Sequence, residues 1–408
     1  MLDRDGLRAR ALAALDKPAK LGADLDLNRY EKASPPRPML SASELRSLPT
    51  ADRQRMLLAG VDLNGRDRCG TYLLVDTSVL HCSSQQEGVE VTPLTGALES
   101  LAWLGDYYWK LVEVDADKYT ASAELDLHDG FLIRALPGSR SIHPMQACLY
   151  LDREGLQQNV HNIVIAEEGS ELHVISGCTT STRLRGGLHV GVTEFFVKKG
   201  AKLTFTMIHN WTEDMAVRPR SAARVEESGL FVSNYVCLKP VRSLQGYPTA
   251  CLAGPGSVAR FYSILAGSPV SDIDLGGRVV LEEPGCRAEI VSRAITNGGR
   301  IMARGQLIGK ATGIKAHLEC RGLIMGGGAM LAVPELEGHA DGVEMSHEAA
   351  VGKIAQEEIN YLMARGLDEE EAVSTIVRGF LKVEVPGLHP LLQAELDRAV
   401  TATQEKSM

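Results

Sequence analysis

The sequence is poor in aromatic residues, lacks a long apolar run and carries no excess of basic charge. Aromatic residues make up 5% of the 408 residues, so a large core must be built mainly from aliphatic side chains. No run approaches the roughly 20 apolar residues of a membrane-spanning helix. The formal net charge of −9 argues against nucleic acid as a partner. The first residues are too charged for a signal peptide, so we expect a cytoplasmic protein without a membrane partner.

Cysteine pairs with the spacing of a local metal site are also missing. In a large cytoplasmic chain the cysteines are expected to be reduced thiols and not a disulfide framework. Because no two are separated by two residues, the chain encodes no zinc finger or ferredoxin-type loop. A metal site must therefore be assembled from distant positions. The eight cysteines are Cys69, Cys82, Cys148, Cys178, Cys237, Cys251, Cys286 and Cys320.

A repeating unit fills the middle of the chain. Each unit has a polar pair, a glycine and then a stretch of alternating apolar residues. The glycines are Gly169, Gly200, Gly229, Gly256 and Gly285, separated by 31, 29, 27 and 29 residues. A near-constant period of this size with strand-like content is typical of a solenoid, which predicts a mainly β, right-handed parallel β-helix. The alternative is a β-sandwich, whose strands usually recur at shorter spacing.

The pattern divides the chain into four parts. Residues 1–60 have the spacing of an N-terminal helical region, and residues 61–150 that of a mixed α/β entry segment. Residues 151–352 carry the repeats and form the expected β-helix core. Residues 353–408 return to helical spacing and form a C-terminal helical region.

The C-terminal region carries clear helix boundaries. Gly366 suits the end of one helix, and Asp368 suits the start of the next, with Glu371 three residues on as in a capping box. A last short helix is expected from Pro390. We expect these helices to cap the open end of the solenoid, because an uncapped end exposes strand edges.

Cys320 and the segment Ser346-His347-Glu348 are the densest candidates for chemistry. Cys320 precedes His347 by 27 residues, about one period, so the two can lie side by side on neighbouring coils. Thiolate and imidazole suit iron, an iron–sulfur cluster or zinc. Since adjacent strand residues face opposite sides, Glu348 shares a metal with His347 only if the strand ends or bulges there. The alternative is a packed cysteine and a hydrogen-bonded histidine without a metal.

Residues 344–354 (EMSHEAAVGKI) and 361–367 (YLMARGL) resemble the C-terminal signature of the SufB/SufD family. In that family a Ser-His or Glu-His-Glu segment leads into a Val-Gly-x-Ile turn and a Tyr-Leu-x-x-Arg-Gly helix. A looser similarity reaches back to about residue 60 and includes Asn210-Trp211. The chain is most similar to SufB, of the short type found in archaea and anaerobes.

The resemblance implies a scaffold for iron–sulfur cluster assembly, not an enzyme, that works with a SufC-type ABC ATPase. Sulfur arrives as persulfide from a donor that is not identified, and a transient cluster forms with iron at a subunit interface. By match, Cys320, His347 and Glu348 are the cluster ligands and Cys178 is the candidate sulfur acceptor. Cys320 and Glu348 are SufB-like, whereas Ser346 is SufD-like.

Because the chain combines both sets of features, we expect a homodimer, with a SufB/SufD-type heterodimer as the alternative. SufC is expected to bind the C-terminal helices through Ile376, Val377 or Phe380.

The sequence departs from SufB along the proposed sulfur path, where Tyr150, Asp152 and Met207 replace an Arg, an Asn and a Thr. Two other functions remain open. One is a SufD-like partner subunit that binds no cluster. The other is a β-helix carbohydrate-active enzyme, which needs a carboxylate pair or a Ca²⁺ cluster.

Overall fold

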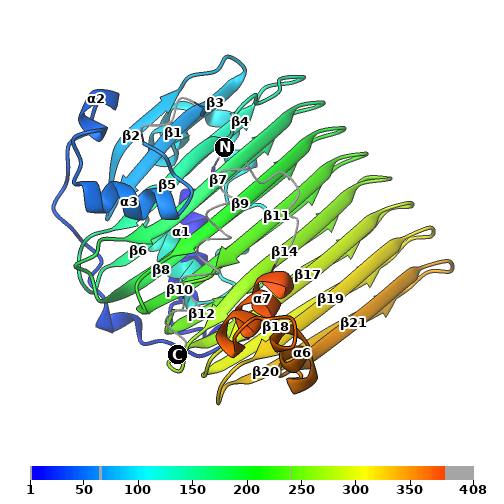
Figure 1. Ribbon diagram of the computed structural model, residues 1–408. Helices are drawn as coiled ribbons and strands as arrows, with labels where there is room; N and C mark the ends of the chain where they lie inside the picture. The colour runs from blue at the N-terminus through cyan, green and yellow to red at the C-terminus, as the bar shows by residue number, and fades with distance from the viewer. Residues whose placement is uncertain (1, 64–66, 240, 382–408) are drawn as a thin grey trace.

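Two large sheets face each other and form a parallel β-solenoid of about eight turns (Figure 1). The structure is a computed structural model that describes residues 2–63, 67–239 and 241–381. It confirms the prediction of a mainly β fold with helices at both ends. The prediction of a last helix from Pro390 falls outside the described residues.

The first sheet has ten strands and runs the length of the solenoid. All neighbouring pairs are parallel except β1 with β2. In spatial order the strands are β2 (Ser78–Ser84), β1 (Gly70–Val75), β5 (Met145–Leu151), β7 (Glu171–Thr180), β9 (Lys202–Asn210), β11 (Leu230–Cys237), β14 (Val258–Gly267), β17 (Arg287–Thr296), β19 (Lys315–Ile324) and β21 (Glu344–Gly352).

The second sheet faces the first, and two of its coils contain interrupted strands. Its only antiparallel pair within the described residues is β3 with β4. Its strands are β3 (Val89–Pro93), β4 (Phe131–Ala135), β6 (Gln157–Ala166), β8 (Gly186–Val197), β10 (Asp214–Val225), β12 (Ser243–Gly246), β13 (Thr249–Leu252), β15 (Asp272–Leu275), β16 (Arg278–Leu281), β18 (Arg300–Gly309) and β20 (Ala329–Gly338).

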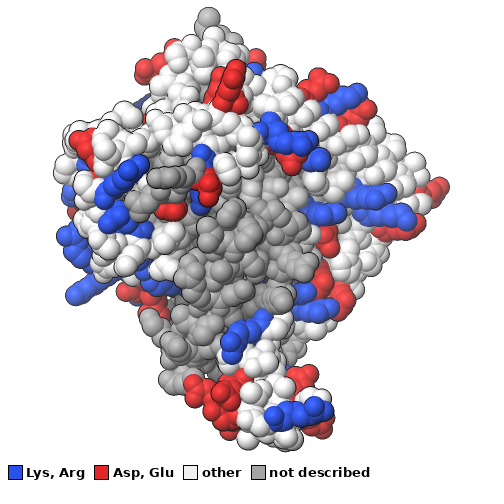
Figure 2. Space-filling model, turned by 45° about the horizontal axis from the view of Figure 1, so that its top comes forward, with Lys and Arg blue, Asp and Glu red and all other residues white. Residues whose placement is uncertain are grey.

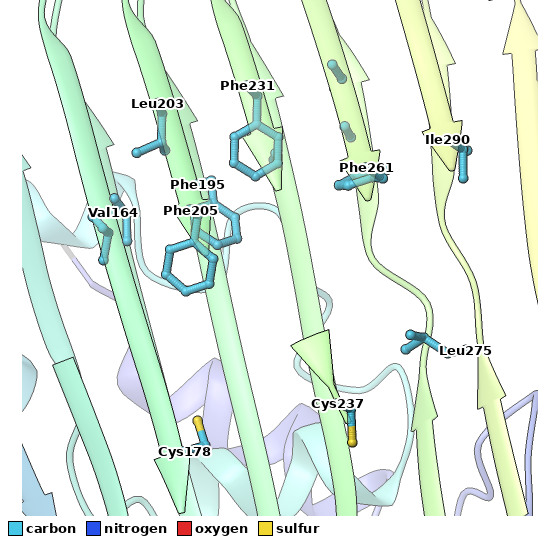
Figure 3. Close-up of a cluster of buried hydrophobic side chains, with 14 of the residues drawn as sticks. Val164, Cys178, Phe195, Leu203, Phe205, Phe231, Cys237, Phe261, Leu275 and Ile290 are labelled. Carbon is cyan, nitrogen blue, oxygen red and sulfur yellow. The ribbon is translucent and has the colours of Figure 1, made fainter. Parts of the chain in front are cut away.

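The core lies between the two sheets and is built from every second residue of the strands. Aliphatic side chains dominate it, as the low aromatic content predicts. A short aromatic column stands at its centre, where the Phe195 ring lies 4.7 Å from Phe205 and 4.9 Å from Phe231. Figure 3 shows Cys178 and Cys237 in this same core. Stacking of the coils therefore buries one continuous interior.

Left-handed residues recur at one corner of the coils. Gly169, Gly200, Gly256 and Gly285 have φ between 65° and 72°. This confirms their prediction as turn positions, because a side chain at such a φ is strained. Gly229 also lies at its corner, where its amide donates to the Glu226 carbonyl at 3.0 Å, but the left-handed residue of that corner is Ser228, with a φ of 56°.

Surface charges pair across neighbouring coils. Lys198–Glu226, Lys199–Glu227 and Lys310–Glu282 each join residues 28 positions apart, with N–O distances of 3.0, 2.7 and 3.3 Å. On the face drawn in Figure 2, the described blue and red side chains lie interspersed and form no broad basic area. Exposed pairs of this kind stabilise a fold by about 1 kcal/mol or less each.

Helices cover parts of the outside of the solenoid. The described α-helices are α1 (Arg4–Ala13), α2 (Ala42–Leu45), α3 (Thr50–Leu58), α4 (Leu94–Ser100), α5 (Lys118–Leu125), α6 (Gln356–Met363) and α7 (Glu369–Leu381), with 3₁₀ helices η1 (Leu27–Arg29) and η2 (Ala102–Asp106). The capping box of α7 is confirmed, since the Glu371 amide donates to Asp368 at 2.7 Å and the Asp368 amide donates to Glu371 at 3.1 Å. In the part of the chain that the structure describes, no helix is long and apolar enough to cross a membrane.

The expectation that α6 and α7 cap the open end of the solenoid is wrong. Figure 1 shows α7 beside β17 of the first sheet. Val377 of α7 packs there in one cluster with Ile264 and Ile295, which point outward from the sheet. Val373 and Phe380 of α7 pack against the same cluster, so the apolar stripe of the helix is buried on this outward-facing row. Among the described residues, β20 pairs only with β18 and β21 only with β19, so both strands keep an unpaired edge.

Candidate functional site

Cys320 and His347 lie on the same inner face of the first sheet, on the last two neighbouring strands β19 and β21. Ala316, Leu318 and Cys320 of β19 point into the core, and Met345 of β21 packs against the same core. His347 is two residues after Met345 and therefore shares its face. We call Cys320 and His347 the terminal pair.

The terminal pair is offset by two positions along the strands. Cys320 is opposite Ala349, and His347 is opposite Leu318. With parallel strands about 4.8 Å apart and a rise of about 3.3 Å per residue, their Cα atoms lie roughly 8 Å apart. The side chains of such diagonal neighbours are within reach of one cluster or metal ion.

Cys320 is buried, whereas His347 is half-buried and has its Nε2 atom shielded from water. Cys320 is fully buried, and burial together with the nearby Glu319 charge raises the pKa of its thiol to about 11. The Nε2 atom of His347 is buried and has no hydrogen-bond partner within the described chain. A buried ring nitrogen normally has a partner, so this one needs an explanation. An external ligand for Nε2 would supply it.

Glu348 lies on the opposite side of β21 from the terminal pair. The strand is regular, and Arg321 donates to the Glu348 carboxylate at 2.8 Å on the outer face. Arg321 also pairs with Glu319 at 2.8 Å, and Glu319 pairs with Arg293. Glu348 thus belongs to a row of charges outside the solenoid. Among the described residues, no group of three or more His, Cys, Asp and Glu side chains is arranged to hold a metal.

Cys178 lies in the interior, far from the terminal pair. It is fully buried on β7, and burial raises its pKa to about 12. Five strand spacings separate β7 from β19, which corresponds to about 24 Å. The structure therefore does not bring Cys178 and Cys320 together.

Sequence analysis missed a polar group beside Cys178. His209 is directly opposite Cys178 on β9, and its Nδ1 atom lies 2.7 Å from the Tyr235 hydroxyl. The Trp211 ring centroid lies 5.7 Å from that of His209. The Nε2 atom of His209 and the Nε1 atom of Trp211 are buried without a partner among the described residues. The repeat period could have indicated this neighbour, because Cys178 and His209 are 31 residues apart and therefore lie on neighbouring coils.

The three departures from SufB occupy different environments. Tyr150 donates to Asp52 at 2.5 Å and is opposite Thr179, so it faces away from Cys178. Asp152 accepts hydrogen bonds from surface arginines. Met207 is the one of the three that faces the interior, where it lines a cavity.

A cavity of about 60 Å³ occupies the interior between Cys178 and the terminal pair. Tyr235 lines one part of its wall and Ser292 another. Tyr235 is the hydrogen-bond partner of His209, and Ser292 is directly opposite Cys320 on the neighbouring strand. The residues that line this cavity thus extend from Tyr235, near the Cys178 end of the core, to Ser292, the neighbour of Cys320.

The three candidate partner-binding residues differ in burial. Val377 is fully buried against the first sheet, and Phe380 is half-buried against the same cluster. Ile376 is half-buried and lies outside that cluster within the described chain. Ile376 is therefore the member of the set that is best placed to meet another protein.

A β-solenoid that brings a thiol and an imidazole to its open end, with reduced thiols and hollow space behind them, has the features of a protein that handles metal and sulfur. The comparisons with known proteins agree. The family model described as "SUF system FeS cluster assembly, SufBD core domain" matches residues 149–380, more than half of the chain. The chain belongs to the SufBD family of iron–sulfur cluster assembly proteins.

Curated relatives bear the same family name. A protein of Methanothermobacter thermautotrophicus (strain Winter) is 47% identical over 403 residues, which cover 97% of each chain. A protein of Archaeoglobus fulgidus is 48% identical over 350 residues, 86% of this chain and 94% of the relative. One from Pyrococcus horikoshii is 31% identical over 320 residues, 77% and 72% of the two chains. All are named iron–sulfur cluster assembly SufBD family proteins, which favours the scaffold over the carbohydrate-active enzyme.

Proposed function

We propose that two copies of this chain meet at their open ends and assemble an iron–sulfur cluster between their terminal pairs. The observation that supports this is the position of His347 on the edge strand β21 and of Cys320 on its neighbour β19, at the end of the solenoid where β20 and β21 have unpaired edges. One chain offers only two converging ligands. A two-fold axis doubles them to two thiolates and two imidazoles, a ligand set that holds a [2Fe–2S] cluster in Rieske proteins.

The open end has the properties of an interface. An unpaired strand edge is a template for a strand of another chain. Leu331 and Leu336 of β20 and Val351 of β21 expose 54%, 40% and 39% of their surface. Burying these residues against a second copy adds apolar contact to the backbone pairing. A SufB/SufD-type heterodimer through the same edges is the alternative.

Sulfur is proposed to arrive as persulfide at Cys178 and to pass through the interior to Cys320. The unpartnered N–H groups of Trp211 and, in the matching tautomer, His209 are suited to stabilise a buried sulfur anion beside Cys178. ATP hydrolysis is proposed to belong to a SufC-type ATPase that binds α7 through Ile376. The chain itself then acts as a scaffold in the cytoplasm.

A second candidate function is a SufD-like partner subunit that binds no cluster. Two observations favour it: Arg321 occupies the Glu348 carboxylate, and Met207 stands where SufB has a threonine. If the chain is such a subunit, every sulfur ligand of the cluster must come from another chain.

Anaerobic reconstitution with ferrous iron and sulfide separates the two functions. We expect a brown chromophore in the wild type that is lost in Cys320→Ala and His347→Ala. Cys286→Ala is the matched control, since Cys286 is also a fully buried core cysteine. The mass of the loaded protein should be twice the 44.1 kDa of one chain. A wild type that binds no iron would exclude the scaffold.

A further inference from the structure

Two histidine rings lie close together inside the solenoid, beside Cys178. His209 of β9 is directly opposite Cys178, and His189 lies on β8 of the facing sheet. The two ring centroids are 6.4 Å apart, with an angle of 84° between the ring planes. Both residues are 2% exposed. We call His189 and His209 the interior pair.

One ring nitrogen of each histidine is held by an oxygen atom. The Gln158 amide nitrogen donates to two main-chain carbonyls, so its Oε1 atom, 3.0 Å from Nδ1 of His189, must accept the proton of that nitrogen. Nε2 of His189 is therefore an unprotonated acceptor. Nδ1 of His209 lies 2.7 Å from the Tyr235 hydroxyl, and its Nε2 atom is buried without a partner within the described chain. An oxygen that holds the far ring nitrogen orients histidines in the same way in metal sites.

Both members of the interior pair are in the state that binds a metal. Burial lowers the pKa of His189 to about 3, and burial together with the nearby His189 holds the pKa of His209 well below its usual value. The rings are therefore neutral, and neutral imidazole is the form that binds metal ions. A Cβ atom at Gly191 would lie 2.9 Å from Nε2 of His189, so the glycine keeps space beside this nitrogen.

The spacing of the interior pair fits one shared ion. A metal ion about 2.0 Å from each Nε2 atom puts the two ring centroids roughly 6 Å apart. The Trp211 centroid lies 5.1 Å from that of His189 and 5.7 Å from that of His209. As the sides of a triangle, the three centroid distances put the midpoint of the interior pair about 4.4 Å from the Trp211 ring. A cation there lies within the range of about 6 Å over which an indole ring attracts it.

The surroundings favour a soft monovalent ion. No carboxylate of the described chain is among the groups that shift the pKa of either ring, so a dication would keep its charge uncompensated in the core. The described residues also lack the group of three or more ligands that tetrahedral zinc needs. Copper(I) binds imidazole and thiolate ligands and is stable with two ligands in a line.

We propose that the interior pair binds copper(I) between its two Nε2 atoms, beside the Trp211 ring. The site is separate from the terminal pair, because four strand spacings, about 19 Å, lie between β9 and β19. Copper(I) on His209 fixes the tautomer that cannot donate to a sulfur anion at Cys178. Copper(I) should therefore hinder sulfur loading there, a consequence that rests on the proposed function, whereas the metal site does not.

Anaerobic titration of the full-length chain with copper(I) against a chromophoric chelator measures the affinity of the site. The titration uses a Cys320→Ala background, which removes the terminal pair as a competing site. We expect one tightly bound ion per chain. His189→Gln and His209→Gln should each weaken binding by about a hundredfold or more, because loss of even an outer hydrogen-bond partner of a metal site typically costs about 10- to 100-fold. His128→Gln is the matched control, since both of its ring nitrogens already bond main-chain groups.

X-ray absorption at the copper edge identifies the ligands and does not depend on whether the variants fold. We expect two nitrogen ligands at about 2 Å. A shell of sulfur alone would assign the ion to cysteines elsewhere and overturn the interior pair. Unweakened binding in both glutamine variants would overturn it as well. Absence of copper binding in the wild type would mean that these polar atoms hold water only, which also overturns the site.

Sulfur loading tests the consequence for Cys178. The wild type is treated with polysulfide, with and without one equivalent of copper(I), and mass spectrometry measures the added sulfur on the Cys178 peptide. We expect copper to lower the loading severalfold. Equal loading would contradict an ion beside Cys178. Absence of loading without copper would instead contradict Cys178 as the sulfur acceptor and leave the copper site standing.

Discussion

Charged substitutions in α7 should separate the residues that hold the helix on the solenoid from those proposed to bind a SufC-type ATPase. Val377 is fully buried against the first sheet, whereas Ile376 is half-buried and lies outside that cluster. Val377→Asp loses about 1.5–3 kcal/mol of apolar burial. It also places a carboxylate where desolvation costs several kcal/mol.

The free-energy cost of Val377→Asp exceeds the stability that α7 has as an isolated helix. α7 has 13 residues, and isolated helices of this length are marginal in water. We therefore expect Val377→Asp to detach α7 and to remove its amide protection. Ile376→Asp should leave the protection intact, because changes at partly exposed positions typically cost about 0.5 kcal/mol. Hydrogen exchange read by mass spectrometry reports both, and Thr375→Asp, at an exposed neighbouring position, controls for the added charge.

Co-purification with SufC completes the test. We expect both aspartate variants to lose the ATPase, Val377→Asp by detaching the helix and Ile376→Asp by disrupting the contact itself. Wild-type recovery of SufC with Ile376→Asp on a protected helix would show that Ile376 does not bind the partner. Full protection of α7 in Val377→Asp would contradict the packing described here.

Three further predictions concern the site, the interior and the corners. Glu348→Gln should take up as much iron as the wild type, because that carboxylate pairs with an arginine outside the solenoid; a loss as large as that of Cys320→Ala would make Glu348 a ligand. Burial raises the pKa of Cys178 and of Cys237 to about 12 each, so both stay protonated in the fold while unfolded thiols ionise above about 8.5. The unfolded state then binds fewer protons, and stability should be full below pH 8.5 and fall by about 1.4 kcal/mol per thiol and pH unit above it; urea titrations at pH 8 and 10 that give equal stability would refute this. Gly200→Ala should lower stability by about 1–2 kcal/mol because its φ is 65°, and thermal melting should show no such loss for an alanine at Gly352, whose surroundings are open.

The solenoid could be predicted from the sequence because the pattern that forms each coil is local and repeats along the chain. A glycine or another left-handed residue recurs at each corner, and the alternation between corners fixes which residues face the core. The period also placed Cys320 and His347 on neighbouring coils. The same alternation allowed Glu348 to share a metal with His347 only if the strand ended or bulged there, and β21 runs regularly through both residues.

Features that depend on packing between distant segments were not predictable. The apolar stripe of α7 indicates that the helix packs on something, but not whether it covers an end or a face. The polar surroundings of Cys178 depend on His209 and Tyr235, which lie on other coils.

The coil-to-coil ion pairs at 28-residue intervals have a consequence for how such chains change length. Removing one complete coil would bring each remaining side chain opposite an equivalent neighbour, whereas removing two or three residues would disrupt every row at once. Insertions and deletions among relatives should therefore occur in whole coils or at the corners. Each lost coil would shorten the hollow interior by about 4.8 Å and bring its two ends closer together.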